Sequence, residues 1–363
     1  MPESPPRAWA EIDLAALRHN LGVAREASGC RVMAVVKAGA YGHGLEEVAS
    51  ALAAENIAFF GVANVGEARR IAATGVSTRI YLLGATWSEE RAEVVEHDWT
   101  PCISSLDEAR HFSELAVDAD KQLKVHLAVD TGMGRGGFVP EGLEKVLAEL
   151  ETLPGIEVEG LGSHLPSADE DDAFTREQFD RFRKCATVLG GAERFKWIHL
   201  SNSAGLLGYD NSPCNLVRPG LMLYGISPLL EFQKRLRNVM TLKSRITLVR
   251  TLPAGHGVSY GREFVTSRET RVATVGIGYG DGYPRHLSGN GAEVVIDDRR
   301  FPVLGRVTMD QVMIDASDAD IQVGDEVELF GPNLRVDELA KKAGTIAWEV
   351  LTGITPRVLR VHQ

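Results

Sequence analysis

The feature that most constrains the fold is a regular alternation of short apolar runs with amphipathic segments. Apolar and β-branched residues dominate the runs, as in strands buried on both faces of a parallel sheet. The segments between them, such as LEEVASALAAE and SLDEARHFSEL, carry apolar residues at helical spacing. Strands are expected at residues 32–37, 58–63, 79–83, 101–104, 123–129, 156–162, 196–200 and 222–225. Eight strands with helices between them predict an α/β fold, a (β/α)8 TIM-type barrel, rather than an open sheet.

The pattern changes after about residue 235, where β-rich segments follow one another between glycine and aspartate turns. Examples are LKSRITLVRTL and AEVVIDDRRFPVLGRV, and one short helix, VDELAKKAG, interrupts the series. We therefore expect two domains, a barrel over residues 8–232 and a mostly β domain over residues 233–363. A strand near residues 8–13 is a candidate to join the β domain, and Asp13 is expected to cap the helix that follows it.

Composition and charge exclude several classes of protein. A formal net charge of −11 argues against a nucleic-acid partner and against an anionic membrane surface. The four cysteines are scattered, and no H-x-x-x-H or H-E-x-x-H pair occurs, so we expect no metal centre. No apolar stretch reaches the length of a membrane span, and residues 1–14 do not read as a signal peptide. These features predict a cytoplasmic protein with reduced thiols.

A lysine directly follows the first apolar run, in the sequence AVVKAGAYGHG. A lone lysine at a strand end usually extends its ammonium into solvent. The other interpretation is an amine at the mouth of a pocket that can lose its proton and form a Schiff base. Active sites of barrels lie at the carboxyl ends of the strands. The polar residues expected on that rim are Lys37, Tyr41, Asp130, Arg135, His164, Asn202 and Ser203, with Arg218 and Gly220 at the entry to the eighth strand.

Three other motifs have weaker support. GVSYG, residues 257–261, matches the G-x-S-x-G pattern of hydrolases, but its flanks are β-like. GMGRGG, residues 132–137, fits a dinucleotide fingerprint, but it follows the fifth strand rather than the first. The acidic loop PSADEDDAF is expected to be solvated and to favour the start of the next helix, rather than to bind a metal.

Eight motifs resemble, in order and spacing, the motif series of alanine racemases: AVVKAGAYGHG, VDTGMGR, GLGSHLPSADE, HLSNSAG, VRPGLMLYG, GVSYGREF, GIGYGDGYPR and GRVTMDQ. The resemblance runs from about residue 9 to the C-terminus and covers both expected domains. It implies a barrel that binds pyridoxal 5'-phosphate (PLP), a C-terminal β domain and a homodimer with shared active sites. The implied function is the interconversion of L- and D-alanine by two-base proton transfer, a source of D-alanine for the cell wall.

The same resemblance implies a role for each matching residue. Lys37 is the lysine that binds PLP and one of the two bases, and Tyr260 is the other base, which acts on the partner subunit's site. Arg218 faces the pyridine nitrogen, keeps it unprotonated and so favours racemisation, and with His164 it supports Tyr260. The other implied contacts to PLP are Tyr41, His164, Asn202, Ser203, Gly220 and Leu221, and those to the substrate are Arg135, Met309 and Tyr279.

Four positions depart from the family pattern. Many members have a lysine, often carbamylated, where this chain has Ala128, and we expect chloride or water beside Arg135 instead. Gly39 replaces the usual asparagine, Thr308 a frequent cysteine, and Pro356 a tyrosine found in some members. Three rival functions follow: a racemase for another or a broader range of amino acids, a non-catalytic PLP-binding barrel, and a PLP decarboxylase. The second domain with GVSYG argues against the binding protein, and the arginine expected at the pyridine nitrogen argues against the decarboxylase.

Overall fold

The computed structural model describes residues 6–363, which form two compact units. The barrel unit comprises Leu17–Ala40 and Leu45–Arg237, and the β unit comprises residues 6–16, Tyr41–Gly44 and Asn238–Gln363. The first residues of the proline-rich start, 1–5, lie outside the described part of the chain. The division expected at residues 232 and 233 falls close to the break before Asn238, but the short segment 41–44 belongs with the β unit.

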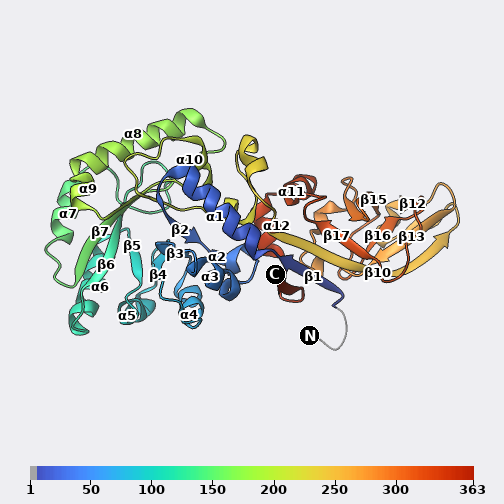
Figure 1. Cartoon of the computed structure of the whole chain (residues 1–363), viewed down its shortest axis with the longest axis horizontal. Coiled ribbons are helices and arrows are strands. Elements are labelled where there is room, and N and C mark those ends of the chain that lie inside the picture. Colours follow the sequence, from blue (N-terminus) through green and yellow to red (C-terminus); the bar gives the residue numbers. More distant parts are fainter. Residues whose placement is uncertain (1–5) are drawn as a thin grey trace. The chain divides into compact units, whose positions relative to one another are not determined.

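An eight-stranded parallel sheet, coloured blue to yellow-green in Figure 1, forms the barrel unit. From β2 to β8 each strand pairs with the next one in sequence, and β2 also pairs with β9, as where Val32 lies opposite Val217. The N–H of Asn215 donates to the carbonyl of Ile198 at 3.0 Å and closes the ring between β9 and β8. The predicted barrel is therefore confirmed. Its strands are β2 (Arg31–Val35), β3 (Phe59–Val62), β4 (Arg79–Leu82), β5 (Thr100–Ile103), β6 (Leu123–Ala128), β7 (Ile156–Gly162), β8 (Trp197–His199) and β9 (Leu216–Val217).

Helices connect the strands, and the amphipathic ones bury one face. In α4, for example, Val65, Ala68 and Ile71 are buried at helical spacing. Asp13 caps α1 as expected, since its carboxylate accepts the N–H of Ala16 at 2.8 Å. The helices around this unit are α1 (Leu14–Ser28), α3 (Leu45–Ala53), α4 (Val65–Ala72), α5 (Arg91–Glu96), α6 (Leu106–Asp118), α7 (Leu143–Leu150), α8 (Asp172–Val188), α9 (Gly191–Arg194) and α10 (Ser203–Gly208).

The acidic loop before α8 behaves as its composition indicates. Asp171 is the N-cap of α8, and its side chain accepts the N–H of Phe174 at 3.0 Å. Asp172 pairs with Arg176 one turn further along the helix. Among the described residues, no group of three or more histidine, cysteine or acidic side chains could hold a metal ion.

The eighth strand does not lie where the sequence indicates it. Residues 222–225 form part of a 3₁₀ helix, Leu221–Tyr224, and its C-cap Gly225, whereas the strand is the two-residue β9. Pro219 has no N–H to donate to a ladder, and the N–H groups of Gly220 and Met222 donate to a serine hydroxyl instead. The correction moves Arg218 from the entry of the eighth strand to its carboxyl end, on the rim where barrels place their chemistry.

The β unit is built around β10 (Met240–Leu252), a strand of 13 residues. The order β13–β16–β15–β14–β17–β10 closes on itself because β10 also pairs with β13, and β1 and β18 extend the sheet beyond β10 (Figure 1). The strand near residues 8–13 thus lies in this sheet. The further strands are β1 (Ala8–Ile12), β11 (Gly257–Val258), β12 (Phe264–Val265), β13 (Thr270–Val275), β14 (Glu293–Ile296), β15 (Arg299–Leu304), β16 (Val312–Asp315), β17 (Glu326–Phe330) and β18 (Leu359–His362).

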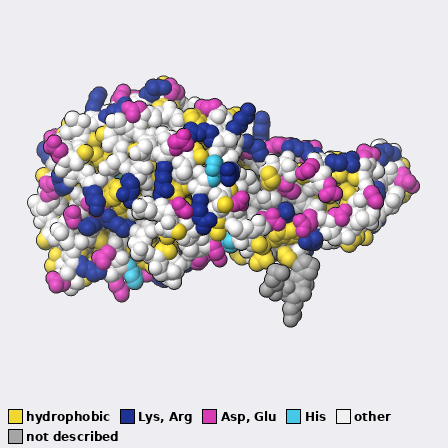
Figure 2. Space-filling view, in the orientation of Figure 1, with side chains coloured by type: hydrophobic (Ala, Val, Ile, Leu, Met, Phe, Trp, Pro, Cys, Tyr) yellow, Lys and Arg dark blue, Asp and Glu magenta, His cyan; other side chains and the backbone are white. Residues whose placement is uncertain are grey.

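Two helices accompany this sheet rather than the one expected. α11 (Val336–Ala343) is the predicted helix, and α12 (Ala347–Gly353) follows it after a left-handed cap at Gly344. Within residues 6–363, no helix is long and apolar enough to cross a bilayer. Lysine, arginine and acidic side chains are interspersed over the face that Figure 2 shows. Cys30, Cys102, Cys185 and Cys214 are all free thiols.

Candidate active site

The lysine singled out by the sequence begins a tight turn at the carboxyl end of the first barrel strand. β2 ends at Val35, and the four residues after Lys37, residues 38–41, have φ angles of 54, 64, 56 and 53°. This left-handed conformation costs an ordinary L-residue roughly 1–2 kcal/mol. Gly39 adopts it without that cost, as the asparagine usual at this position in the family would tolerate it. The turn is therefore strained, and something must hold it.

Glu67, in the first turn of α4, braces this turn. Its Oε1 accepts the N–H of Ala38 at 2.6 Å, and its Oε2 accepts the N–H of Ala63 at 2.9 Å. One carboxylate thus joins the loops that follow β2 and β3. Sequence reasoning missed Glu67; its one signal was its place three residues after Asn64, the residue that caps α4.

Lys37 lies among positive charges on the rim of the barrel unit. Burial, and then the charge of Arg135, lower the pKa of Lys37, while Glu67 acts in the opposite direction. Burial, and then the charges of Arg218 and Arg135, lower the pKa of His164 to about 3. The lysine therefore loses its proton more readily than a free amine, and the histidine is neutral at pH 7.

Arg218 is buried directly after β9, where carbonyl and imidazole acceptors surround it. Its guanidinium donates to the carbonyls of Ser163 and Leu200 and, at 3.1 Å, to Nδ1 of His164. Another N–H of the guanidinium donates to Nδ1 of His199, a residue that sequence reasoning did not select. Because arginine can only donate, Nδ1 of the neutral His164 is an acceptor, and its proton lies on Nε2.

Donor groups for an anion gather around the Ser203 hydroxyl. Ser203 is the first residue of α10, and Gly220 precedes the 3₁₀ helix that starts at Leu221. The hydroxyl oxygen accepts the N–H of Gly220 at 3.0 Å and that of Met222 at 3.3 Å. A hydroxyl and backbone N–H groups at one place are the donors that phosphate oxygens require.

Asn202 and Tyr41, two other predicted cofactor residues, lie differently. Both ends of the Asn202 amide are used within the chain: Oδ1 accepts the N–H of Gly205, and Nδ2 donates to the carbonyl of Leu165, each at 3.0 Å. Asn202 thus caps α10 and fixes the residue that follows it. Tyr41 ends the left-handed turn and is buried, and burial raises the pKa of its hydroxyl to about 12.

The surroundings of Arg135 differ from the usual family pattern. Ala128 is buried at the end of β6, where the carbamylated lysine of other members would stand. Asp130, the nearest acidic residue in sequence, does not brace the guanidinium. Its carboxylate accepts N–H groups from residues 132–134 at 2.8–3.1 Å and so shapes the loop itself.

The remaining predicted residues belong to the β unit and are exposed on it. Tyr260 follows β11 with 70% of its side chain accessible, and Met309 and Tyr279 are 51% and 40% exposed. The last two are neighbours, because the N–H of Tyr279 donates to the carbonyl of Thr308 at 3.0 Å and that of Gly280 to Met309 at 2.8 Å. Large apolar side chains exposed in this way often mark a surface that another chain covers.

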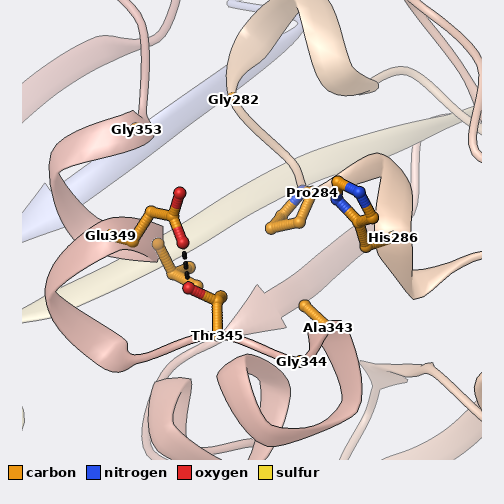
Figure 3. Close-up of a pocket in the computed structure, with 9 residues that line it drawn as sticks. Gly282, Pro284, His286, Ala343, Gly344, Thr345, Glu349 and Gly353 are labelled. Atoms are coloured by element: carbon orange, nitrogen blue, oxygen red, sulfur yellow. Dashed lines mark hydrogen bonds between the residues drawn. The ribbon is translucent and has the colours of Figure 1, made fainter.

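A cavity of about 330 Å³ in the β unit contains none of the predicted residues. Figure 3 shows the side chains of Thr345 and Glu349 joined by a hydrogen bond at its wall, with His286 on the opposite side. Its other lining residues are Gly282, Pro284, Ala343, Gly344, Val350 and Gly353. The candidate chemistry therefore lies elsewhere, at the barrel rim.

Comparison with known families identifies the family of the chain. The family description "Alanine racemase, N-terminal domain" matches residues 12–228, and "Alanine racemase, C-terminal domain" matches residues 239–362. The chain belongs to the alanine racemase family. The resemblance inferred from its motifs is confirmed, and as a member of this family the chain is an amino acid racemase, an isomerase.

Three relatives show how far the likeness extends. An alanine racemase of Syntrophobacter fumaroxidans is 41% identical over 357 residues, covering 96% of this chain and 95% of that protein. The solved alanine racemase of Clostridium difficile 630 is 35% identical with a TM-score of 0.93, over 99% of this chain and 97% of that one. The Bartonella henselae alanine racemase, solved with covalently bound pyridoxal phosphate, is 29% identical with a TM-score of 0.91, over 99% of this chain and 100% of that one.

Proposed function

We propose that this alanine racemase family member interconverts L- and D-alanine with PLP held at the rim of the barrel unit. The observation that carries the proposal is the environment of Lys37, an amine whose pKa is lowered by burial and by Arg135. An amine that loses its proton more readily than a free lysine can both anchor an aldehyde cofactor and act as a base. The reaction is inferred from the family, and the choice of Lys37 as the reacting lysine is inferred from this environment.

The donor set of the barrel unit fits PLP. Lys37 would be the covalent anchor, and the Ser203 hydroxyl with the N–H groups of Gly220 and Leu221 would bind the phosphate, once the Gly220 N–H turns from the Ser203 hydroxyl to which it donates here. Tyr41, at the end of the turn that follows Lys37, would be a further contact. Asn202 holds the start of α10 in place and so acts through its neighbour. Bound PLP withdraws electrons from the substrate's α carbon, which makes the proton on that carbon removable.

Arg218 sets how strongly the cofactor withdraws electrons. A buried guanidinium with four acceptors around it stays charged, and it would be the partner of the pyridine nitrogen when PLP is bound. A permanent cation beside that nitrogen would keep it unprotonated and limit the withdrawal of electrons. Arg218 would therefore favour quick return of the α proton, and so racemisation over side reactions.

Two bases exchange the α proton on opposite faces. Nζ of Lys37 takes or returns the proton on one face, and the phenolic oxygen of Tyr260 does so on the other. His164 assists, because its proton lies on Nε2 and can be donated to that phenolic oxygen, which stabilises the phenolate. Free tyrosine has a pKa of about 10, so this support is required at neutral pH.

Tyr260 acts from a second copy of the chain in a homodimer. Its exposure supports this assignment, as does that of Met309 and Tyr279, which neighbour each other, since exposed apolar side chains that lie together often mark an interface with another chain. Met309 and Tyr279 contact the substrate side of the same shared site. Arg135 binds the substrate carboxylate, and a chloride ion takes the place left by Ala128 beside it.

The test is a chiral assay of the purified protein with PLP against a panel of L- and D-amino acids. Alanine should be interconverted fastest, and a faster reaction with another amino acid would change the substrate. Borohydride should fix the cofactor to Lys37, and Lys37→Ala should abolish both fixation and racemisation. Lys124→Ala, at an exposed position on β6, is the matched control and should leave both unchanged. Fixation to a different lysine would refute the site.

A further inference from the structure

A chain of buried polar side chains runs through the barrel interior from Arg218. The guanidinium meets Nδ1 of His199, and Nε2 of His199 lies 2.8 Å from Nδ1 of His126. Nε2 of His126 then faces Oε1 of Glu159 at 3.6 Å, and Glu159 forms an ion pair with Arg79. Both histidines and the glutamate are at most 4% exposed. None of the residues beyond Arg218 has a part in the function proposed above.

The chemistry of the side chains fixes the direction of every hydrogen bond in this chain. Arg218 can only donate, so Nδ1 of His199 is an acceptor and the proton of the neutral ring lies on Nε2. That proton is donated to Nδ1 of His126, which places the second ring's proton on Nε2 as well. The opposite direction would set two donors against each other at Arg218 and turn a lone pair toward the carboxylate of Glu159.

The charges of the groups agree with this arrangement. Burial lowers the pKa of His126 and, more strongly, that of His199, so both rings are neutral at pH 7. Burial alone would raise the pKa of Glu159, but His126 and Arg79 outweigh it and hold the pKa at about 2. An ionised carboxylate therefore terminates a chain that begins at a permanent cation.

The backbone is shaped to hold this chain. Val125 pairs with Val158 but His126 pairs with Gly160, so Glu159 is the extra residue of a β-bulge in β7. Bulges re-aim side chains, and this one buries Glu159 although Glu157, two residues earlier, is exposed. A side chain at Gly160 would overlap the His126 ring, and one at Gly162 would overlap the His199 ring. Two glycines thus make the space that two imidazoles fill.

We propose that Glu159 and His126 are positioning residues that fix the tautomer of His199 and, through it, the orientation of Arg218. Nε2 of His126 is buried without a hydrogen-bond partner among the described residues, and the carboxylate of Glu159, 3.6 Å away, is the negative charge that its N–H faces. Without that charge, only Arg218 favours this pair of tautomers, so the His199 ring and the guanidinium that it accepts from are held less firmly. The expected effect on catalysis rests on the proposed role of Arg218 at the pyridine nitrogen. The assignment of the two tautomers does not depend on that role.

Neutron diffraction from crystals of the perdeuterated holoenzyme tests the tautomers directly. We expect deuterium on Nε2 of both His126 and His199 and none on either Nδ1. Deuterium on Nδ1 of either ring, or on both nitrogens of one ring, would overturn the proposal. This result is independent of whether the protein racemises alanine, so a failure of the proposed function in the chiral assay is distinguishable from a failure here.

Variants of Glu159 test the effect on the site. Glu159→Leu removes the carboxylate that faces the His126 N–H, and kcat should fall roughly 10- to 100-fold, as when a catalytic group is misplaced by a distant change. KM should change little, because Arg135 is untouched, and the absorption band of the bound cofactor should shift. Glu159→Gln keeps an oxygen facing the His126 N–H and should restore kcat to within a few fold, and Glu157→Leu should match the wild type.

These variants also separate positioning from a general structural role. A merely structural loss would lower the thermal midpoint without moving the cofactor band or splitting kcat from KM. If Glu159→Leu does not fold, Glu159→Gln and the neutron map decide. An unchanged kcat and an unchanged cofactor band in a folded Glu159→Leu would refute a positioning role.

Discussion

Glu67 should contribute more to stability than its place on the surface of a helix indicates. It accepts the N–H groups of Ala38 and Ala63, at 2.6 and 2.9 Å, and so supports a turn in which four consecutive residues have positive φ. Those residues hold Lys37 at the barrel rim. Glu67→Ala would leave the strained turn without its brace, and both N–H groups without a charged acceptor.

The expected loss follows from these two hydrogen bonds. A hydrogen bond to a charged group contributes about 1.5–3 kcal/mol when buried, and less when solvent can replace it. Because Glu67 is half-buried, we expect Glu67→Ala to lower the free energy of unfolding by about 1.5–3 kcal/mol in total. The affinity for PLP should fall as well, since binding through Lys37 requires the same turn.

Glu46→Ala is a closely matched control. Glu46 also lies in the first turn of a helix and also accepts two hydrogen bonds, from Arg70 at 2.7 and 2.8 Å. It braces no strained backbone, and exposed ion pairs of this kind contribute about 0–1 kcal/mol. Urea unfolding of both variants, with spectroscopic titration of PLP, measures the difference. Equal destabilisation and equal PLP affinity would refute the role given to Glu67.

Three further predictions concern the site and the buried histidines. A Lys37→Ala variant mixed with a Tyr260→Phe variant should regain activity after subunit exchange, because one site of the heterodimer holds both bases. No recovery after verified exchange would place the site within one chain. The activity of the wild type should depend on chloride and not on carbon dioxide. The Ala128→Lys variant should gain a response to carbon dioxide. If removal of chloride does not change the wild-type rate, water rather than chloride lies beside Arg135. The folded chain holds the pKa of three barrel histidines below the ordinary value of 6.5, so the unfolded chain binds protons first as the pH falls. The free energy of unfolding should therefore decrease from pH 7 to 5, by up to about 1.4 kcal/mol per pH unit for each histidine, and a flat profile in urea titrations would show that these rings are protonated in the native state.

The residues that a reader of the sequence can find are those that follow long buried strands. A lysine or histidine after a run such as RVMAV or EGLGS stands out, because parallel strands are apolar on both faces. Lys37, Arg135 and His164 were found in this way, and the structure brings all three to one rim. Arg218 was selected on the same basis but misplaced, since β9 has only two residues and the apolar run after it is a 3₁₀ helix.

The supporting residues could not be found, because their place depends on register. Simple alternation gives Glu157 and Glu159 the same face of β7, and the sequence does not distinguish them. The bulge at Glu159, opposite Val125 and His126, separates them, so that Glu157 is solvated and Glu159 is buried beside His126 and Arg79. A bulge arises from how two strands pair, so the pattern of apolar and polar residues in one strand does not predict it.

The hydrogen-bond acceptors around Arg218 could not be predicted from the sequence either. A guanidinium buried to 5% exposure needs a partner for most of its N–H groups, since an unpaired buried charge is far more costly than an unpaired neutral group. Two of those partners are main-chain carbonyls, of Ser163 and Leu200, which every residue possesses and no motif can mark. The third and fourth are histidines whose acceptor nitrogens exist only in one tautomer. The charge of the arginine can be predicted from the sequence. Its orientation cannot, because the carbonyls and imidazoles that accept from it come together only in the folded barrel.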